Sequence, residues 1–64
     1  MVKINGEELN VTGKTAEQFL LENGYDIKRV AVELNGDILP KVQYECKILQ
    51  DGDSVEIVSF VGGG

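Results

Sequence analysis

Apolar and polar positions alternate in two short runs near the start of the chain. The alternation covers residues 2–5 and returns in residues 8–11, and a period of two is typical of a half-buried strand. Asn5 and Gly6 stand between the two runs, and both residue types tolerate the positive φ angles of a tight turn. The pattern therefore predicts an N-terminal β-hairpin.

A helical period replaces the strand period in residues 16–23. Thr15 is placed to cap the first turn, and Gln18, three residues later, completes a capping box. Gly24 stands where a left-handed residue commonly ends a helix. The sequence predicts one short amphipathic helix between these signals.

The second half of the chain returns to strand patterns. Residues 30–34 alternate, the Asn-Gly pair at 35–36 predicts a second hairpin, and residues 38–39 begin a short return strand. Pro40 lacks an N–H group, so that strand stops or lies at an edge. A last strand is expected in residues 54–61.

Residues 41–49 show neither period clearly. We expect an irregular or 3₁₀ segment here, from which Tyr44, Ile48 and Leu49 reach the core. A single cysteine, Cys46, lies in this segment. Because a lone cysteine without a histidine to activate it usually acts as a small buried apolar residue, we expect that role for it rather than a part in sulfur transfer.

The order strand, strand, helix, strand, short strand, strand predicts an α+β fold of the β-grasp (ubiquitin-like) type. This is a mixed sheet of four to five strands with one main helix packed on one face. The last strand should lie in the middle, parallel to the first, because the helix supplies the long connection that parallel pairing needs. The expected core is Ile4, Leu9, Val11, Phe19, Leu20, Ile27, Val30, Val32, Leu34, Ile38, Leu49, Val55 and Ile57.

Three glycines, Gly62, Gly63 and Gly64, follow the last predicted strand. Glycine loses the most conformational entropy on ordering and has no side chain to pack, so a strand has no structural use for them. We therefore divide the chain into a β-grasp domain, residues 1–61, and a flexible tail, residues 62–64. Extended, the tail would reach about 10 Å and fit a narrow pocket of another protein, with a carboxylate at its tip.

Composition excludes several functions. The 64 residues carry a net charge of −5, and Lys28-Arg29 is the only adjacent basic pair, so the basic footprint of a nucleic-acid binder is missing. One cysteine and no histidine exclude a disulfide framework and a Cys/His zinc site. We expect no membrane span and no leader peptide, and the lone cysteine suits the reducing cytoplasm.

Four stretches of the chain carry a family resemblance. They are the opening at 2–7, the strand, turn and proline at 30–40, the L-x-D-G-D-x-V-E-I motif at 49–57 and the glycine end at 60–64. In this combination the whole chain resembles the bacterial ThiS-type sulfur carriers, small proteins that deliver sulfur for the thiazole of thiamin. An Asp-Gly turn alone is common, whereas the full combination is specific.

The resemblance implies a mechanism and partners. An E1-like (ThiF-type) enzyme would adenylate the Gly64 carboxylate with ATP, and sulfur from a cysteine-derived persulfide donor would displace AMP. The resulting thiocarboxylate would give its sulfur to a ThiG-type thiazole synthase. No cofactor is expected to be bound beyond this covalent acyl-adenylate and thiocarboxylate, and a carrier that visits several partners is expected to be a monomer when free.

The chain itself lacks the residues for catalysis. It has no phosphate-binding loop of the G-x-x-x-x-G-K-[ST] type and no His to activate a Ser or Cys nucleophile, so we expect no enzyme and no metal site. Three alternatives stay open: the small subunit of molybdopterin synthase, a ubiquitin-like modifier conjugated to lysines, and a binding module with inert glycines. The absence of proline in residues 59–61 favours the thiamin carrier over the molybdopterin protein.

Val58 and Phe60 are candidate docking residues. If Val55 and Ile57 face the core, a period of two places Val58 and Phe60 on the opposite face, beside the glycines. Two exposed apolar side chains there would form a docking patch for a partner. The alternative is that the strand twists near its end and buries Phe60.

Overall fold

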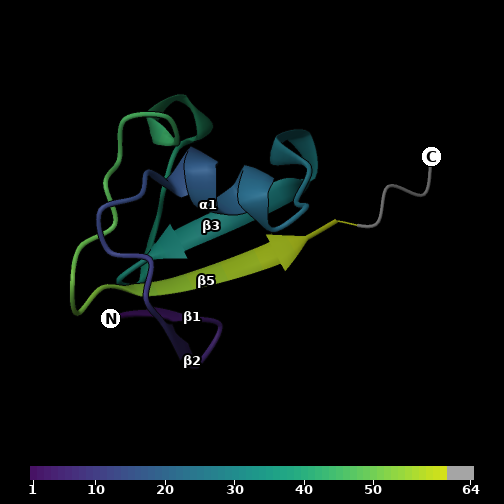
Figure 1. Cartoon of the computed structure of the whole chain (residues 1–64). Coiled ribbons are helices and arrows are strands. Elements are labelled where there is room, and N and C mark those ends of the chain that lie inside the picture. Colours follow the sequence, from purple (N-terminus) through teal and green to yellow (C-terminus); the bar gives the residue numbers. More distant parts are fainter. Residues whose placement is uncertain (61–64) are drawn as a thin grey trace.

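The structure is a computed structural model, and it describes residues 1–60. Within these residues the chain forms a five-stranded sheet, one face of which is covered by a helix (Figure 1). The elements in chain order are β1 (Val2–Ile4), β2 (Glu7–Leu9), α1 (Ala16–Glu22), η1 (Ile27–Arg29), β3 (Val30–Leu34), β4 (Asp37–Ile38), η2 (Lys41–Gln43) and β5 (Ser54–Ser59), where η marks a 3₁₀ helix.

The sheet has the strand order β2-β1-β5-β3-β4. Strand β5 pairs in parallel with β1 and antiparallel with β3, so the last described strand lies in the middle of the sheet. Helix α1 lies in the crossover that makes the parallel pair possible (Figure 1). The predicted β-grasp fold is confirmed.

Two Asn-Gly turns set the register of the two hairpins. Asn5 and Asn35 both have positive φ, 50° and 53°, as a two-residue turn between right-twisted strands requires. In the first hairpin Val2 pairs with Leu9. This register leaves Val11 without a partner in β1. The predicted strand over residues 8–11 is therefore shorter and begins earlier, and Val11 lies half-buried outside it.

The capping box of α1 is present as predicted. The Thr15 hydroxyl oxygen accepts from the Gln18 N–H at 3.1 Å, and the Gln18 side-chain oxygen accepts from the Thr15 N–H at 2.9 Å. The next two backbone N–H groups donate to carbonyls of the 44–47 segment, which satisfies donors that a helix start leaves free. The helix ends at Glu22, one residue earlier than predicted, and Asn23 is its C-cap.

The core lies between α1 and the sheet. Leu20, Val30 and Leu49 are almost fully buried, as predicted. Val2 and Tyr44 are buried to the same degree, and Tyr44 is the residue that directly follows η2. The buried set is Val2, Ile4, Ala16, Phe19, Leu20, Val30, Val32, Leu39, Tyr44, Leu49, Val55 and Ile57. Four other predicted core residues, Leu9, Val11, Ile27 and Leu34, are only partly buried against it.

Three expectations for the β4–η2 region are wrong. Ile38 is 69% exposed, because the two-residue turn pairs it with Glu33, and Leu39 is buried in its place. Ile48 is half exposed, since its neighbour Leu49 takes the core position. Cys46 is exposed rather than buried, because Tyr44 fills the space under this segment and the Cys46 thiol sulfur lies 3.6 Å from the Gln43 carbonyl oxygen.

Candidate functional site

The centre of the candidate site is the end of strand β5. Val55 and Ile57 point into the core, while the residues between and after them are exposed, so the strand is anchored along one face. The residues predicted to carry the chemistry, Gly62, Gly63 and Gly64, lie outside the residues that the structure describes. The structure therefore describes the strand that precedes the glycines, up to Phe60.

Val58 and Phe60 are exposed on the strand that leads to the glycines. Their exposed fractions are 54% and 58%, and Val58 lies opposite Ala31 of β3 on the face of the sheet away from α1. The Phe60 N–H donates to the Arg29 carbonyl at 2.6 Å, which continues the β3–β5 ladder past Ser59. The alternative in which the strand buries Phe60 is wrong for the described structure.

Both flanks of β5 are held by asparagine side chains. Asn5 makes two hydrogen bonds to the backbone of Ile57 from the β1 side. On the β3 side, the Asn35 side-chain oxygen accepts from the Ser54 N–H at 2.8 Å, and the Asn35 N–H donates to the Ser54 carbonyl at 2.7 Å. Sequence reasoning identified both asparagines only as turn residues and missed this contact, although two Asn-Gly pairs in one short chain were the available signal.

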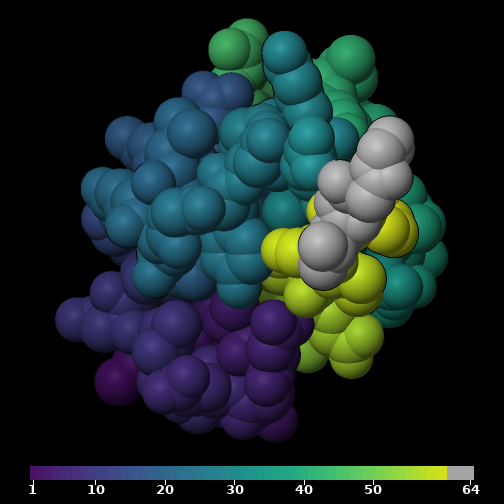
Figure 2. Space-filling model, turned by 90° about the vertical axis from the view of Figure 1, so that its right-hand side faces the viewer, coloured from purple at the N-terminus to yellow at the C-terminus, as the bar shows by residue number. Residues whose placement is uncertain are grey.

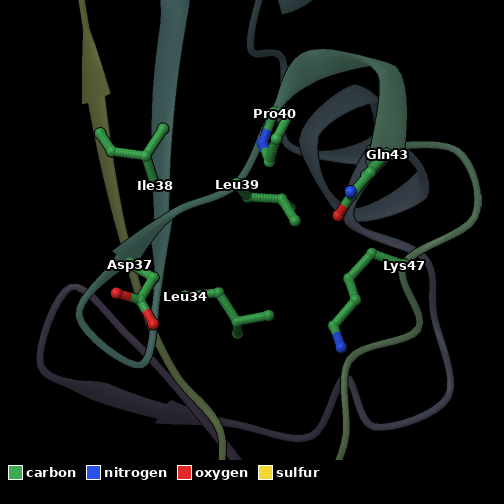
Figure 3. Close-up of a pocket in the computed structure, with 7 residues that line it drawn as sticks. All are labelled: Leu34, Asp37, Ile38, Leu39, Pro40, Gln43 and Lys47. Atoms are coloured by element: carbon green, nitrogen blue, oxygen red, sulfur yellow. The ribbon is translucent and has the colours of Figure 1, made fainter.

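A second surface feature lies at the other end of the sheet. A hollow of about 230 Å³ opens beside β4, where Leu34 and Leu39 point inward and Lys47 faces them from the opposite side (Figure 3). On one side the hollow reaches Leu34, which pairs with Val55 near the start of β5, and on the other it is lined by Gln43 of η2. Its lining includes no Ser, Thr, Cys, Tyr or His.

Residues 1–60 contain no group of three or more His, Cys, Asp or Glu residues placed to hold a metal ion. Among these same residues, the buried Tyr44 is the ionisable group that stands out. Burial raises the pKa of its phenol above the ordinary value, and the backbone of Val32 offsets part of the rise. No helix in the described part of the chain is long and apolar enough to cross a membrane.

A solved structure shares this arrangement. The crystal structure of the thiamine biosynthesis protein (ThiS) from Geobacter metallireducens superposes with a TM-score of 0.75 at 28% identity, over 98% of this chain and 97% of that one. The strand order and this neighbour define the chain as a small domain of the ThiS-like β-grasp class. The model of the ThiS family matches residues 2–64. The chain belongs to the ThiS family of sulfur carrier proteins, which act in thiamine biosynthesis as carriers and not as enzymes.

Two relatives differ in length. The sulfur carrier protein ThiS of Thermus thermophilus is 41% identical over 64 residues, and the alignment covers all of both chains. A thiazole synthase of Paramagnetospirillum magneticum is 50% identical over 62 residues, which is 95% of this chain but only 19% of that protein. The second relative thus holds a ThiS-like segment within a much longer polypeptide.

Proposed function

We propose that the carboxylate of Gly64 carries the sulfur. The full-length alignment with the Thermus thermophilus sulfur carrier, glycine segment included, is the observation that carries this proposal. An E1-like, ThiF-type enzyme would supply the ATP site. A carboxylate is a poor electrophile, so the carrier must first be activated, and the chain offers no ATP-binding loop of its own.

The chemistry proceeds in three transfers. The Gly64 carboxylate oxygen attacks the α-phosphorus of ATP, and pyrophosphate leaves. The terminal sulfur of a cysteine-derived persulfide then attacks the acyl carbon, and AMP leaves with the bonding electron pair. A thiol reduces the resulting acyl disulfide, which leaves the thiocarboxylate on Gly64 and a disulfide on the donor side.

A ThiG-type thiazole synthase is the proposed acceptor of this sulfur. The Paramagnetospirillum magneticum relative supports the pairing, because one polypeptide named as a thiazole synthase contains a segment that is 50% identical to this chain. Two activities joined in one chain in a relative commonly act on each other. The reducing cytoplasm is the compartment in which we place this exchange, and we take the free carrier to be a monomer.

The pairing of β5 on both sides supports a division of the chain into a domain and a tail. In the proposal residues 1–61 form the domain that the partner holds, and residues 62–64 enter the partner's pocket, where Gly62 and Gly63 leave room that any side chain would fill. Val58 and Phe60 are the docking contacts beside that entry, since about half of each side chain is exposed on an otherwise anchored strand. An exposed apolar pair next to a reactive end is typical of a protein contact.

Intact-protein mass spectrometry tests the proposal. The chain is incubated with the cognate E1-like enzyme, ATP, a cysteine-derived persulfide source and a thiol. The expected product has one oxygen replaced by sulfur, located on the C-terminal peptide by fragmentation, and it requires ATP. A chain lacking Gly63 and Gly64 serves as the control. An AMP adduct that never accepts sulfur, or no change with an active enzyme, would contradict the proposal.

A further inference from the structure

Half of the positive side chains of this acidic protein lie around one end of the molecule. Lys28 and Arg29 belong to η1, and Lys41 begins η2. These are three of the six Lys and Arg residues in a chain with a net charge of −5. We refer to Lys28, Arg29 and Lys41 as the basic collar.

Backbone contacts place the collar next to the end of β5. The Phe60 N–H donates to the Arg29 carbonyl at 2.6 Å, so Arg29 is the residue directly beside the last described position of the chain. The Lys41 ammonium donates to the Lys28 carbonyl at 3.1 Å, which brings η2 to the same place. Figure 2 looks onto this end of the molecule, where β5, in yellow, is flanked by the teal residues of β3 and the segment before it.

Internal ion pairs neutralise little of the positive charge of the collar. Within residues 1–60 the collar forms one ion pair, in which Asp26 Oδ2 lies 3.6 Å from Arg29 Nε. Both of these side chains are more than half exposed, and exposed pairs of this kind are weakened by water and salt. Asp26 also accepts a hydrogen bond from the Lys28 backbone N–H. Among residues 1–60 neither the Lys28 nor the Lys41 ammonium forms an ion pair, and the Lys41 ammonium is bonded only to the Lys28 carbonyl.

The two ends of β5 therefore differ in charge. Lys28, Arg29 and Lys41 lie at the end that leads to the glycines. Carboxylates lie nearer its start, where Asp53 directly precedes the strand and Asp37 pairs with Leu34, which in turn pairs with Val55. A surface of one sign within a molecule of the opposite net charge orients the molecule in the field of a partner and selects a partner surface of complementary sign.

We propose that the basic collar docks on acidic side chains at the mouth of the pocket in which the adenylating enzyme receives Gly64. This inference rests on the proposed function, since it names the surface that meets the collar when the glycine segment is inserted. Phe60 is joined to Arg29 of the collar by a backbone hydrogen bond, and Val58 is exposed two residues before it, so apolar and cationic residues lie close together at this end of β5.

Charge reversal with a matched control tests the collar. Lys28→Glu/Arg29→Glu is compared with Lys3→Glu/Lys47→Glu, which has the same net charge but alters residues near the start of β5, since Lys3 pairs with Ser54 and Lys47 lines the hollow beside Leu34. ATP–pyrophosphate exchange by the cognate enzyme gives kcat and KM for each carrier. Urea unfolding of each variant is measured alongside.

For the collar variant we expect KM to rise about tenfold or more at low salt with kcat within about twofold of the original, while KM of the control changes by less than about threefold. The difference should shrink between about 20 mM and about 300 mM NaCl as the charges are screened. Equal KM values for the two variants, or a collar effect that persists unchanged at high salt, would overturn the inference. If the collar variant does not fold, Lys28→Gln/Arg29→Gln replaces it and must show the same salt-dependent rise, in smaller measure.

The two proposals fail in different ways. An original chain that is never adenylated by an active enzyme contradicts the proposed function and removes the collar's role with it. An original chain that is adenylated normally, with collar and control variants that behave alike, contradicts the collar alone.

Discussion

The side chain of Asn5 binds the backbone of Ile57, 52 residues further along the chain. Its Oδ1 accepts from the Ile57 N–H at 2.8 Å, and its Nδ2 donates to the Ile57 carbonyl at 3.3 Å. One side chain thereby continues the parallel β1–β5 ladder beyond the last backbone pair, Ile4 with Val55. The turn that closes the first hairpin thus also fixes the strand from which the glycine segment starts.

Replacing Asn5 with Gly or with Ala should lower the free energy of unfolding by two different amounts. Asn5→Gly keeps the positive φ of 50° but loses the contacts with Ile57 and makes the unfolded chain more flexible, and we expect a cost of about 1–3 kcal/mol, mostly for leaving the Ile57 groups without a partner. Asn5→Ala loses the same contacts and adds the strain of a left-handed Ala, roughly 1 kcal/mol more. Urea unfolding of both variants measures the two steps. Equal stability of Asn5→Gly and the original chain would show that the contacts contribute nothing.

Leu39 and Ile38 are neighbours with opposite surroundings and offer a matched pair. Leu39 is 6% exposed and Ile38 is 69% exposed. Leu39→Ala should cost about 2–5 kcal/mol, because it leaves a cavity in the core. Ile38→Ala should lie within about 0.5 kcal/mol of the original, as surface changes usually do. Thermal or urea unfolding decides between them, and an equal loss in both variants would contradict the register of the β3–β4 hairpin.

Tyr44 should make the protein sensitive to alkali. Burial raises the pKa of its phenol in the folded state, so the unfolded chain releases this proton at a lower pH than the folded one. Its contribution to the free energy of unfolding is therefore complete below a pH of about 10, the ordinary value, and is lost as the pH rises through the folded value. Urea midpoints measured between about pH 9 and pH 11 should fall more steeply for the original chain than for Tyr44→Phe. Parallel curves for the two proteins would assign the alkaline loss to other groups.

Phe60→Asp should weaken adenylation without unfolding the domain. The side chain is 58% exposed, so the folded state loses little, whereas a docking contact would lose its apolar anchor. We expect KM for the carrier to rise about tenfold or more, the range of an interface hot spot. Leu21→Asp is the control, since Leu21 is 59% exposed on α1 and gives the same change of charge. Identical pyrophosphate-exchange kinetics for the two variants would exclude the patch.

Local signals in the sequence predicted the parts of the fold that local chemistry determines. The capping box of Thr15 and Gln18 and the positive φ of Asn5 and Asn35 depend on residues close in sequence, and all are present. The alternation of Val55 and Ile57 with exposed neighbours also needs only a period of two. The strand order then followed from the connections that such elements permit.

The errors lie where two adjacent apolar residues compete or where no period exists. Ile38 and Leu39 are chemically alike, and only the pairing of Asp37 with Leu34 decides which one faces the core. Tyr44 takes its buried place from an irregular segment, which leaves Cys46 outside. The collar depends on two long-range contacts, from Lys41 to Lys28 and from Phe60 to Arg29, which no local pattern in the sequence predicts.

The central position of β5 also governs how this protein is made. A ribosome that has released residues 1–53 has delivered β1 to β4, α1 and both 3₁₀ turns, yet β1 and β3 have no common neighbour until Ser54–Ser59 emerges. The two hairpins cannot join into one sheet before β5 is available, because the pairing of β1 with β5 closes a loop of most of the chain. Folding is thus completed only by the segment that immediately precedes the glycine end. A chain cut short before Ser54 keeps the residues of both hairpins but lacks the strand that joins them into one sheet, so it could not complete this fold.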